Sequence, residues 1–178
     1  MTFDIYDGDQ KVRFSLGQNG NTKLFVIGLN PSTADADKSD QTMRKVKGFV
    51  ERQKKFGGFV MLNLCPLRAT NPKALPILEE KELICLAGCN GRAIHRILKR
   101  QNAPTIWAAW GNNIKNRHYL MRYLQAIVKV AMKKKAEWVM TGELTKRGHP
   151  RHPSRLGDEI EFRHFNVEEY LCDFSTLR

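Results

Sequence analysis

The chain has 178 residues and a formal net charge of +12, and its composition is 42% hydrophobic and 27% charged. This length suits one domain with a real hydrophobic core, and the composition is that of an ordinary globular protein. No run of about 18 apolar residues is present, which excludes a membrane-spanning helix, and no apolar signal segment follows Met1. We therefore expect a single cytoplasmic domain over residues 1–178 that does not interact with membranes.

Predicted strands and helices alternate along most of the chain. Residues 3–6 and 12–16 predict a short N-terminal hairpin. Apolar runs at 23–29 and 59–64 predict buried strands, and the amphipathic segment between them predicts a helix over 41–55. We further expect helices over 78–100 and 114–133, a strand and turn over 105–111, strands over 137–140 and 159–165, and a short C-terminal tail. This alternation predicts an α/β fold with a mostly parallel sheet covered on both faces.

Polar side chains gather where the predicted parallel strands end. Ligands of such sheets bind beyond the carboxyl ends of the strands, so these segments are the candidate site. Their asparagine and histidine side chains suit the recognition of a neutral planar ligand and the orientation of a water molecule, whereas proton abstraction usually uses paired carboxylates or a lysine. The four segments are 28–33, 62–68, 110–113 and 148–156.

Each of these signals also has a purely structural interpretation. Asn30 before Pro31 is common turn chemistry, and Asn63 is equally compatible with capping a loop. Gly111 permits a tight turn before a helix, and Arg151 and Arg155 are compatible with solvated surface charges. The placement of all these residues at successive strand ends favours a functional site.

The basic character of the chain indicates a polyanionic partner. The 30 Lys and Arg residues exceed the 18 Asp and Glu residues, which favours nucleic-acid binding; the alternative is a merely basic protein. The four cysteines, at positions 65, 85, 89 and 172, form no CxxC pair. We interpret them as reduced structural thiols and expect no metal site.

Several motifs resemble a family catalogued as domain of unknown function 1643, which occurs in bacteria and phages. The resemblance covers about residues 12–157, and the family name implies no activity. Its motifs are Gly28-Leu29-Asn30-Pro31-Ser32-Thr33-Ala34-Asp35, Asn63-Leu64 with Arg68-Ala69-Thr70, Ala109-Trp110-Gly111-Asn112, and Gly148-His149-Pro150-Arg151-His152-Pro153.

The same segments, in the same order, more distantly resemble the uracil-DNA glycosylase superfamily. Gly28 to Pro31 is similar to its water-positioning motif, and Val60 to Asn63 is similar to the strand whose asparagine contacts the base edge. Trp107 to Gly111 resembles its hydrophobic strand, and His152 to Leu156 resembles its His-Pro-Ser loop. The resemblance implies a three-layer α/β/α sandwich with a mostly parallel four-stranded central sheet, and no cofactor.

This second resemblance also implies roles for individual residues. Asn30 and His152 would be catalytic, Asn30 by positioning a water and His152 by donating a hydrogen bond to the departing base. Leu156 would fill the space that a flipped base leaves in the DNA, beside backbone contacts from Arg151, Ser154 and Arg155. The expected base- or substrate-binding residues are Pro31, Ser32, Asn63, Arg68, Trp110, Gly111 and His149.

The predicted function is therefore excision of a damaged or modified base from double- or single-stranded DNA. Two alternatives remain: a non-catalytic nucleic-acid-binding module with the same pocket, and a hydrolase or transferase acting on free nucleosides or nucleotides. For the last, Asp35, Asp37 and Asp40 are candidate ligands of a divalent cation, although acidic residues before a helix also favour its dipole. The sequence gives no indication of a protein partner.

Overall fold

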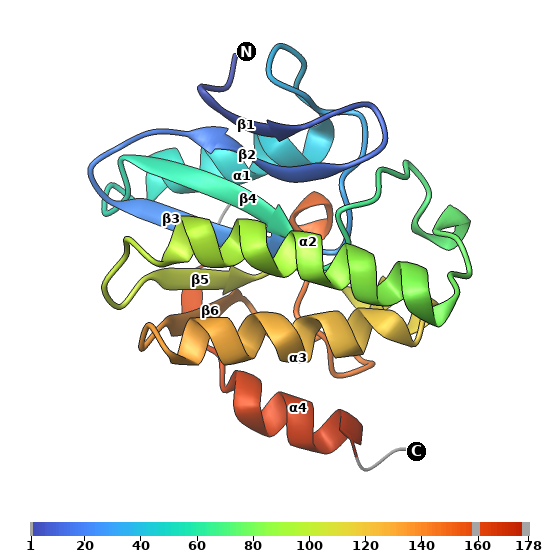
Figure 1. Cartoon of the computed structure of the whole chain (residues 1–178). Helices are drawn as coiled ribbons and strands as arrows, with labels where there is room; N and C mark the ends of the chain where they lie inside the picture. The colour runs from blue at the N-terminus through green and yellow to red at the C-terminus, as the bar shows by residue number, and fades with distance from the viewer. Residues whose placement is uncertain (1, 158–160, 176–178) are drawn as a thin grey trace.

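The computed structural model describes residues 2–157 and 161–175. Within these residues the fold has one mixed seven-stranded sheet, in the order β1-β2-β4-β3-β5-β6-β7, and four α-helices. Figure 1 shows the helices arranged around this sheet. The strands are β1 (Ile5–Gly8), β2 (Arg13–Gln18), β3 (Lys23–Gly28), β4 (Gly58–Asn63), β5 (Thr105–Ala108), β6 (Glu137–Thr141) and β7 (Phe162–His164), and the helices are α1 (Gln41–Arg52), α2 (Glu80–Leu98), α3 (Tyr119–Met132) and α4 (Val167–Ser175).

The four central strands β4, β3, β5 and β6 are parallel, as the alternation of strand and helix predicts. The whole sheet is larger than the four-stranded sheet that the resemblance implies, because antiparallel strands extend both edges. The N-terminal hairpin joins one edge through β2, where Leu16 pairs with Met61 of β4. At the other edge β7 pairs with β6. Both additions give the outer parallel strands a hydrogen-bonding neighbour.

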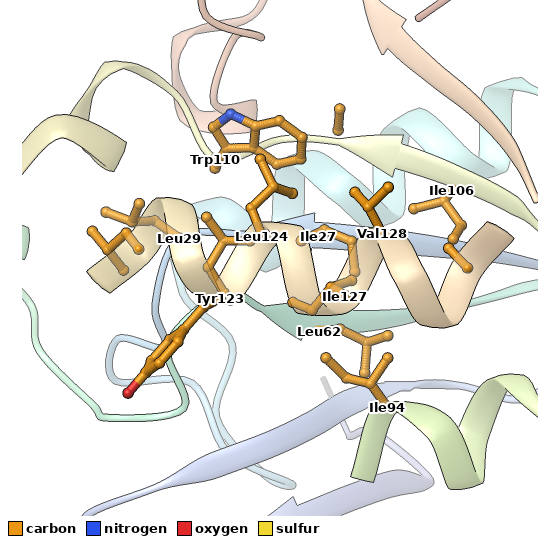
Figure 2. Close-up of a cluster of buried hydrophobic side chains, with 14 of the residues drawn as sticks. Ile27, Leu29, Leu62, Ile94, Ile106, Trp110, Tyr123, Leu124, Ile127 and Val128 are labelled. Carbon is orange, nitrogen blue, oxygen red and sulfur yellow. The ribbon is translucent and has the colours of Figure 1, made fainter. Parts of the chain in front are cut away.

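Helices cover both faces of the sheet, so the expected three layers are present. The side chains of α2, α3 and α4 pack on one face against alternate residues of the central strands, such as Ile27, Leu62 and Ile106. Figure 2 shows Leu124, Ile127 and Val128 of α3 together with these strand residues. The other face packs against α1 through Met43, Val46, Phe49 and Val50.

The C-terminal segment contains a helix, α4, where the sequence predicted only a short tail. Its Val167 and Tyr170 are buried in the same core as α3, and Tyr170 contacts Trp110 and Phe165. The helix has nine residues, so its apolar stripe spans too few turns for a helical period to be recognised in the sequence.

The segment after β5 also differs from the prediction. Within the strand and turn expected over 105–111, the strand ends at Ala108, and the helix expected over 114–133 is divided into a 3-10 turn (Asn112–Asn116) and α3. The interruption falls at Arg117, whose φ of −142° and ψ of 130° are extended rather than helical. Gly111 precedes the 3-10 turn, with a φ of 70° and a ψ of −173° that essentially only glycine adopts. No helix in the described part of the chain is long and apolar enough to cross a membrane.

Candidate functional site

A cleft of about 910 Å³ lies at the carboxyl ends of the parallel strands, where the sequence placed the site. Its walls come from the segment after β3, the first turn of α1, the turn after β5 and the loop between β6 and β7. Of the predicted site residues, those that line it are Asn30, Ser32, Trp110, Gly111, Arg151, His152, Ser154 and Arg155. Pro31, Asn63, Arg68, His149 and Leu156 are not part of this lining.

His152 is a half-buried residue of the cleft lining. Its Nδ1 lies 2.9 Å from the Ser154 Oγ and accepts the Ser154 backbone N–H at 3.3 Å. Because a backbone N–H can only donate, Nδ1 carries no proton, and the neutral ring therefore has its proton on Nε2. Burial lowers the pKa of His152 to about 4; Asp40 opposes this shift and Arg155 adds to it. The ring is therefore neutral at physiological pH.

Close contact with Gly111 fixes the position of His152. A Cβ atom added at Gly111 would lie 3.0 Å from the Cβ of His152, closer than side chains normally approach. The turn after β5 and the loop after β6 can therefore meet only because Gly111 lacks a side chain. His152 also caps the short 3-10 turn over Pro153–Arg155, which packs near α1.

Asn30 follows β3 and lines the cleft, but its amide nitrogen is already engaged. Nδ2 donates to the carbonyl oxygens of Pro31 at 2.9 Å and Ala69 at 2.8 Å. These bonds join the segment after β3 to the loop after β4, so Asn30 has the structural role that turn chemistry indicates. Its Oδ1 accepts no hydrogen bond from a described residue, which leaves this oxygen available for a water.

Asn63, the last residue of β4, has a buried side chain without partners. The residue is 1% exposed, and neither its Nδ2 nor its Oδ1 has a hydrogen-bond partner in the described protein. A Cβ at Gly28 would lie 2.9 Å from this Oδ1 and would also clash with the Cε of Met61. Both side chains therefore lie over Gly28, and Met61 lines the cleft. A buried amide with no partner is costly, so this position favours a ligand or water.

His149 lies in the core rather than in the cleft. It is fully buried and stacks on Phe174 of α4, and its Nδ1 lies 2.7 Å from the Tyr170 hydroxyl. The Tyr170 oxygen also accepts the indole N–H of Trp110 at 3.2 Å. Burial lowers the pKa of His149 to about 4, and Lys115 and Arg147 add to the shift. This placement indicates that His149 supports the fold on which His152 is carried.

Two further predicted residues have structural contacts. Arg68 donates to the backbone oxygens of Asp9, Ser32 and Ala34, and so ties the N-terminal hairpin to the segment after β3. Leu156 is buried in the core beside α1, so in this conformation it is not placed to enter a DNA duplex. Leu156 is buried because its side chain packs against the apolar face of α1.

The acidic residues before α1 bind backbone groups. The Asp35 carboxylate accepts the N–H groups of Asp37 and Lys38, and Asp40 caps α1 by accepting the Met43 N–H at 2.8 Å. Among the described residues, no group of three or more His, Cys, Asp or Glu side chains is placed to hold a metal ion. The geometry accordingly favours a capping role for Asp35 and Asp40.

Sequence reasoning missed several residues of the cleft, above all Arg13. It lies at the start of β2, is 2% exposed and reaches the cleft from beside the parallel strands. A single arginine in a short predicted hairpin gives no periodic or motif signal, so only the pairing of β2 with β4 reveals its place. The cleft is also lined by Met61, Thr70, Thr145, Lys146 and Arg147, which were not predicted.

The fold and the cleft define a mixed α/β protein with a polar, basic cleft at its strand ends. Residues 13–154 match the family described as a protein of unknown function (DUF1643), and the chain belongs to this family. The comparisons with curated proteins and with solved structures gave no match.

Proposed function

We propose that this protein acts on nucleic acid as a DNA glycosylase-like hydrolase that recognises and excises a damaged or modified base. The observation that carries the proposal is the neutral His152 in the cleft lining, whose Nδ1 accepts the Ser154 N–H, so that its proton is on Nε2. The distant resemblance of segments 28–31, 60–63, 107–111 and 152–156 to the uracil-DNA glycosylase superfamily supports the same function and a fold of that type.

In this reaction a water forms a bond to C1′ of the sugar while the bond from C1′ to the base nitrogen breaks. The electron pair of the broken bond leaves with the base, and the proton lost by the water ultimately neutralises it. A neutral histidine suits this step, because its hydrogen bond to a base oxygen strengthens as negative charge develops there. The Oδ1 of Asn30 suits the holding of the water, and an amide removes no proton from it.

The base itself would occupy the space beside Asn63. Its unpaired amide offers one donor and one acceptor, the pattern needed for the edge of a base. Met61 also lies over Gly28 and lines the cleft, so its flexible side chain would have to turn aside for a base to reach this amide. The proposed recognition therefore includes a side-chain movement.

The test uses a panel of oligonucleotides that each contain one modified base. After incubation with the protein, added alkali cleaves the strand at any abasic site. We expect at least one base to be excised, and we expect His152→Gln to reduce the rate by about 100-fold or more. The matched control is His118→Gln, at an exposed histidine outside the cleft, which should excise at the normal rate.

A non-catalytic nucleic-acid-binding module is the second candidate. It is favoured by the burial of Asn63 and Leu156, because neither side chain reaches the cleft in this conformation. Tight binding of the oligonucleotides without any alkali-labile site would identify this module. If the protein neither binds nor cleaves them, both candidates are wrong.

A further inference from the structure

Arg13 is a buried cation that the protein itself does not neutralise. Its guanidinium donates from Nη1 to the Ala34 carbonyl oxygen at 2.8 Å, and its Nε is buried without an acceptor. No ion pair within the described residues includes it. Buried charges in proteins are normally paired with an opposite charge, because desolvation strongly disfavours an isolated ion.

A second cation, Arg68, makes the burial of the Arg13 charge still less favourable. Arg68 donates from its own Nη1 to the same Ala34 oxygen, at 2.9 Å, so two guanidinium groups converge on one carbonyl. Burial lowers the pKa of Arg13 to about 10, and the charge of Arg68 adds to this shift, while the charges of Asp40 and Asp35 oppose it. Since the Ala34 carbonyl already has Arg68 as a donor, satisfying this oxygen does not require Arg13.

The cleft that Arg13 lines is rich in cations. The lining contains one carboxylate, Asp40, which is occupied by the N–H of Met43 at the start of α1. Gln41 and Thr42, in the first turn of α1, also line it, and the partial positive charge of a helix N-terminus favours an anion there. The other cations of the lining are Lys146, Arg147, Arg151 and Arg155.

We propose that Arg13 anchors a phosphate-binding subsite in the cleft. The bound group is a phosphate of a nucleotide, either a phosphodiester of DNA next to the recognised base or the phosphate of a free nucleotide. Its identification as a nucleotide phosphate rests on the proposed function, whereas the binding of the phosphate does not. A phosphate oxygen supplies the negative charge and the acceptor that Arg13 lacks, and the planar guanidinium suits it.

The decisive variant is Arg13→Met, which keeps much of the side-chain volume and removes the charge. Because an isolated buried cation is unfavourable, we expect this variant to melt no earlier than the wild type in buffer without phosphate. We expect its affinity for a 5′-nucleoside monophosphate and for a short oligonucleotide to fall by about tenfold or more. The matched control is Arg100→Met, an exposed arginine outside the cleft, which should bind as the wild type does.

Titration calorimetry with a nucleoside, its 5′-monophosphate and an oligonucleotide separates the two sources of phosphate. If the wild type binds the monophosphate more tightly than the nucleoside, and Arg13→Met loses this preference, the ligand is a free nucleotide. If only the oligonucleotide binds in a way that depends on Arg13, the ligand is a phosphodiester of DNA. The proposal is overturned if the wild type binds neither phosphate form, or if Arg13→Met binds like the wild type. These binding measurements do not depend on base excision. They therefore test the phosphate subsite even if the protein proves not to be a glycosylase.

Discussion

Asn30 has a structural role through one atom of its amide, and its proposed chemical role uses the other. Its Nδ2 holds two carbonyl oxygens in place, while its Oδ1 remains available at the cleft. An aspartate at this position would retain the oxygen but lose the donor. Aspartate is therefore not a neutral replacement here, although a carboxylate is also able to hold a water.

We therefore expect Asn30→Asp to be less stable than Asn30→Ala. The alanine variant leaves the Ala69 carbonyl without this donor, at a cost of about 1–2 kcal/mol. The aspartate variant adds repulsion between a carboxylate and two carbonyl oxygens. Urea unfolding of the two variants and the wild type measures the order. Unfolding of both variants at the wild-type midpoint would contradict the role of this amide in joining the two loops.

Two histidines, the buried His149 and the half-buried His152, predict a dependence of stability on pH. Burial lowers the pKa of both His149 and His152 from about 6.5 in the unfolded chain to about 4 in the folded protein. The unfolded chain therefore binds more protons between these values, so the stability that these groups confer is complete above pH 6.5 and is lost as the pH falls toward 4.

We expect His149→Gln to flatten this dependence. For the fully buried His149 the effect amounts to roughly 3 kcal/mol across the window, because one pKa unit corresponds to about 1.4 kcal/mol. Urea unfolding across the interval gives the slope of the unfolding free energy against pH for each protein. Identical slopes in the variant and the wild type would show that His149 does not titrate in this way.

At the scale of elements, the turn after β5 determines the position of the site. Gly111 begins the 3-10 turn with a backbone that other residues avoid, and it allows the loop that carries His152 to approach. Next to it in the chain, Trp110 reaches α4 through the Tyr170 hydroxyl. A buried polar chain thus connects α4, the turn after β5 and the loop after β6 through His149.

We expect Gly111→Ala to lower the free energy of unfolding by about 1–3 kcal/mol, the usual cost of a strained backbone. It should also displace His152, because the added Cβ lies 3.0 Å from the Cβ of that residue. The matched control is Gly91→Ala, inside α2, where an added Cβ has no neighbour within 4 Å. Alanine favours helix there and should stabilise by about 0.5–1 kcal/mol. Thermal melting compares the two, and equal shifts would contradict the strain at Gly111.

At the scale of the whole molecule, the net charge of +12 is spread over both ends of the sheet. The cations at the cleft, such as Lys146 and Arg147, lie at the carboxyl ends of the strands. Arg100 and Lys133 follow α2 and α3 at the opposite end of the sheet, where β5 and β6 begin. Only the first group is placed to contact a nucleic acid held in the cleft.

We expect DNA binding to weaken steeply with salt, because phosphate neutralisation releases counterions. Each phosphate contact contributes a slope of roughly −0.9 to the plot of log binding constant against log salt concentration for duplex DNA. Replacing Lys146 and Arg147 by glutamine should reduce this slope by about 2, and replacing Arg100 and Lys133 should leave it unchanged. Fluorescence anisotropy at several salt concentrations measures both, and equal slopes in all three proteins would place the DNA elsewhere.

Much of the fold follows from the sequence alone. The apolar runs at 23–29 and 59–64 are long enough to specify the buried parallel strands β3 and β4, and the amphipathic period specifies α1, α2 and α3. Because the carboxyl ends of parallel strands meet at one edge, the residues after those strands could be expected to surround one cleft. Asn30, Gly111 and His152 do line it.

Only the tertiary structure decided which polar residues face the cleft. His149 and His152 lie three positions apart in one loop, yet the first packs against α4 and the second lines the cleft. Arg13 joins the site because β2 pairs with the outer parallel strand β4, and Leu156 leaves it because α1 offers an apolar face. Local sequence fixes periodicity and turns, whereas the burial of a side chain depends on surfaces contributed by segments distant in the chain.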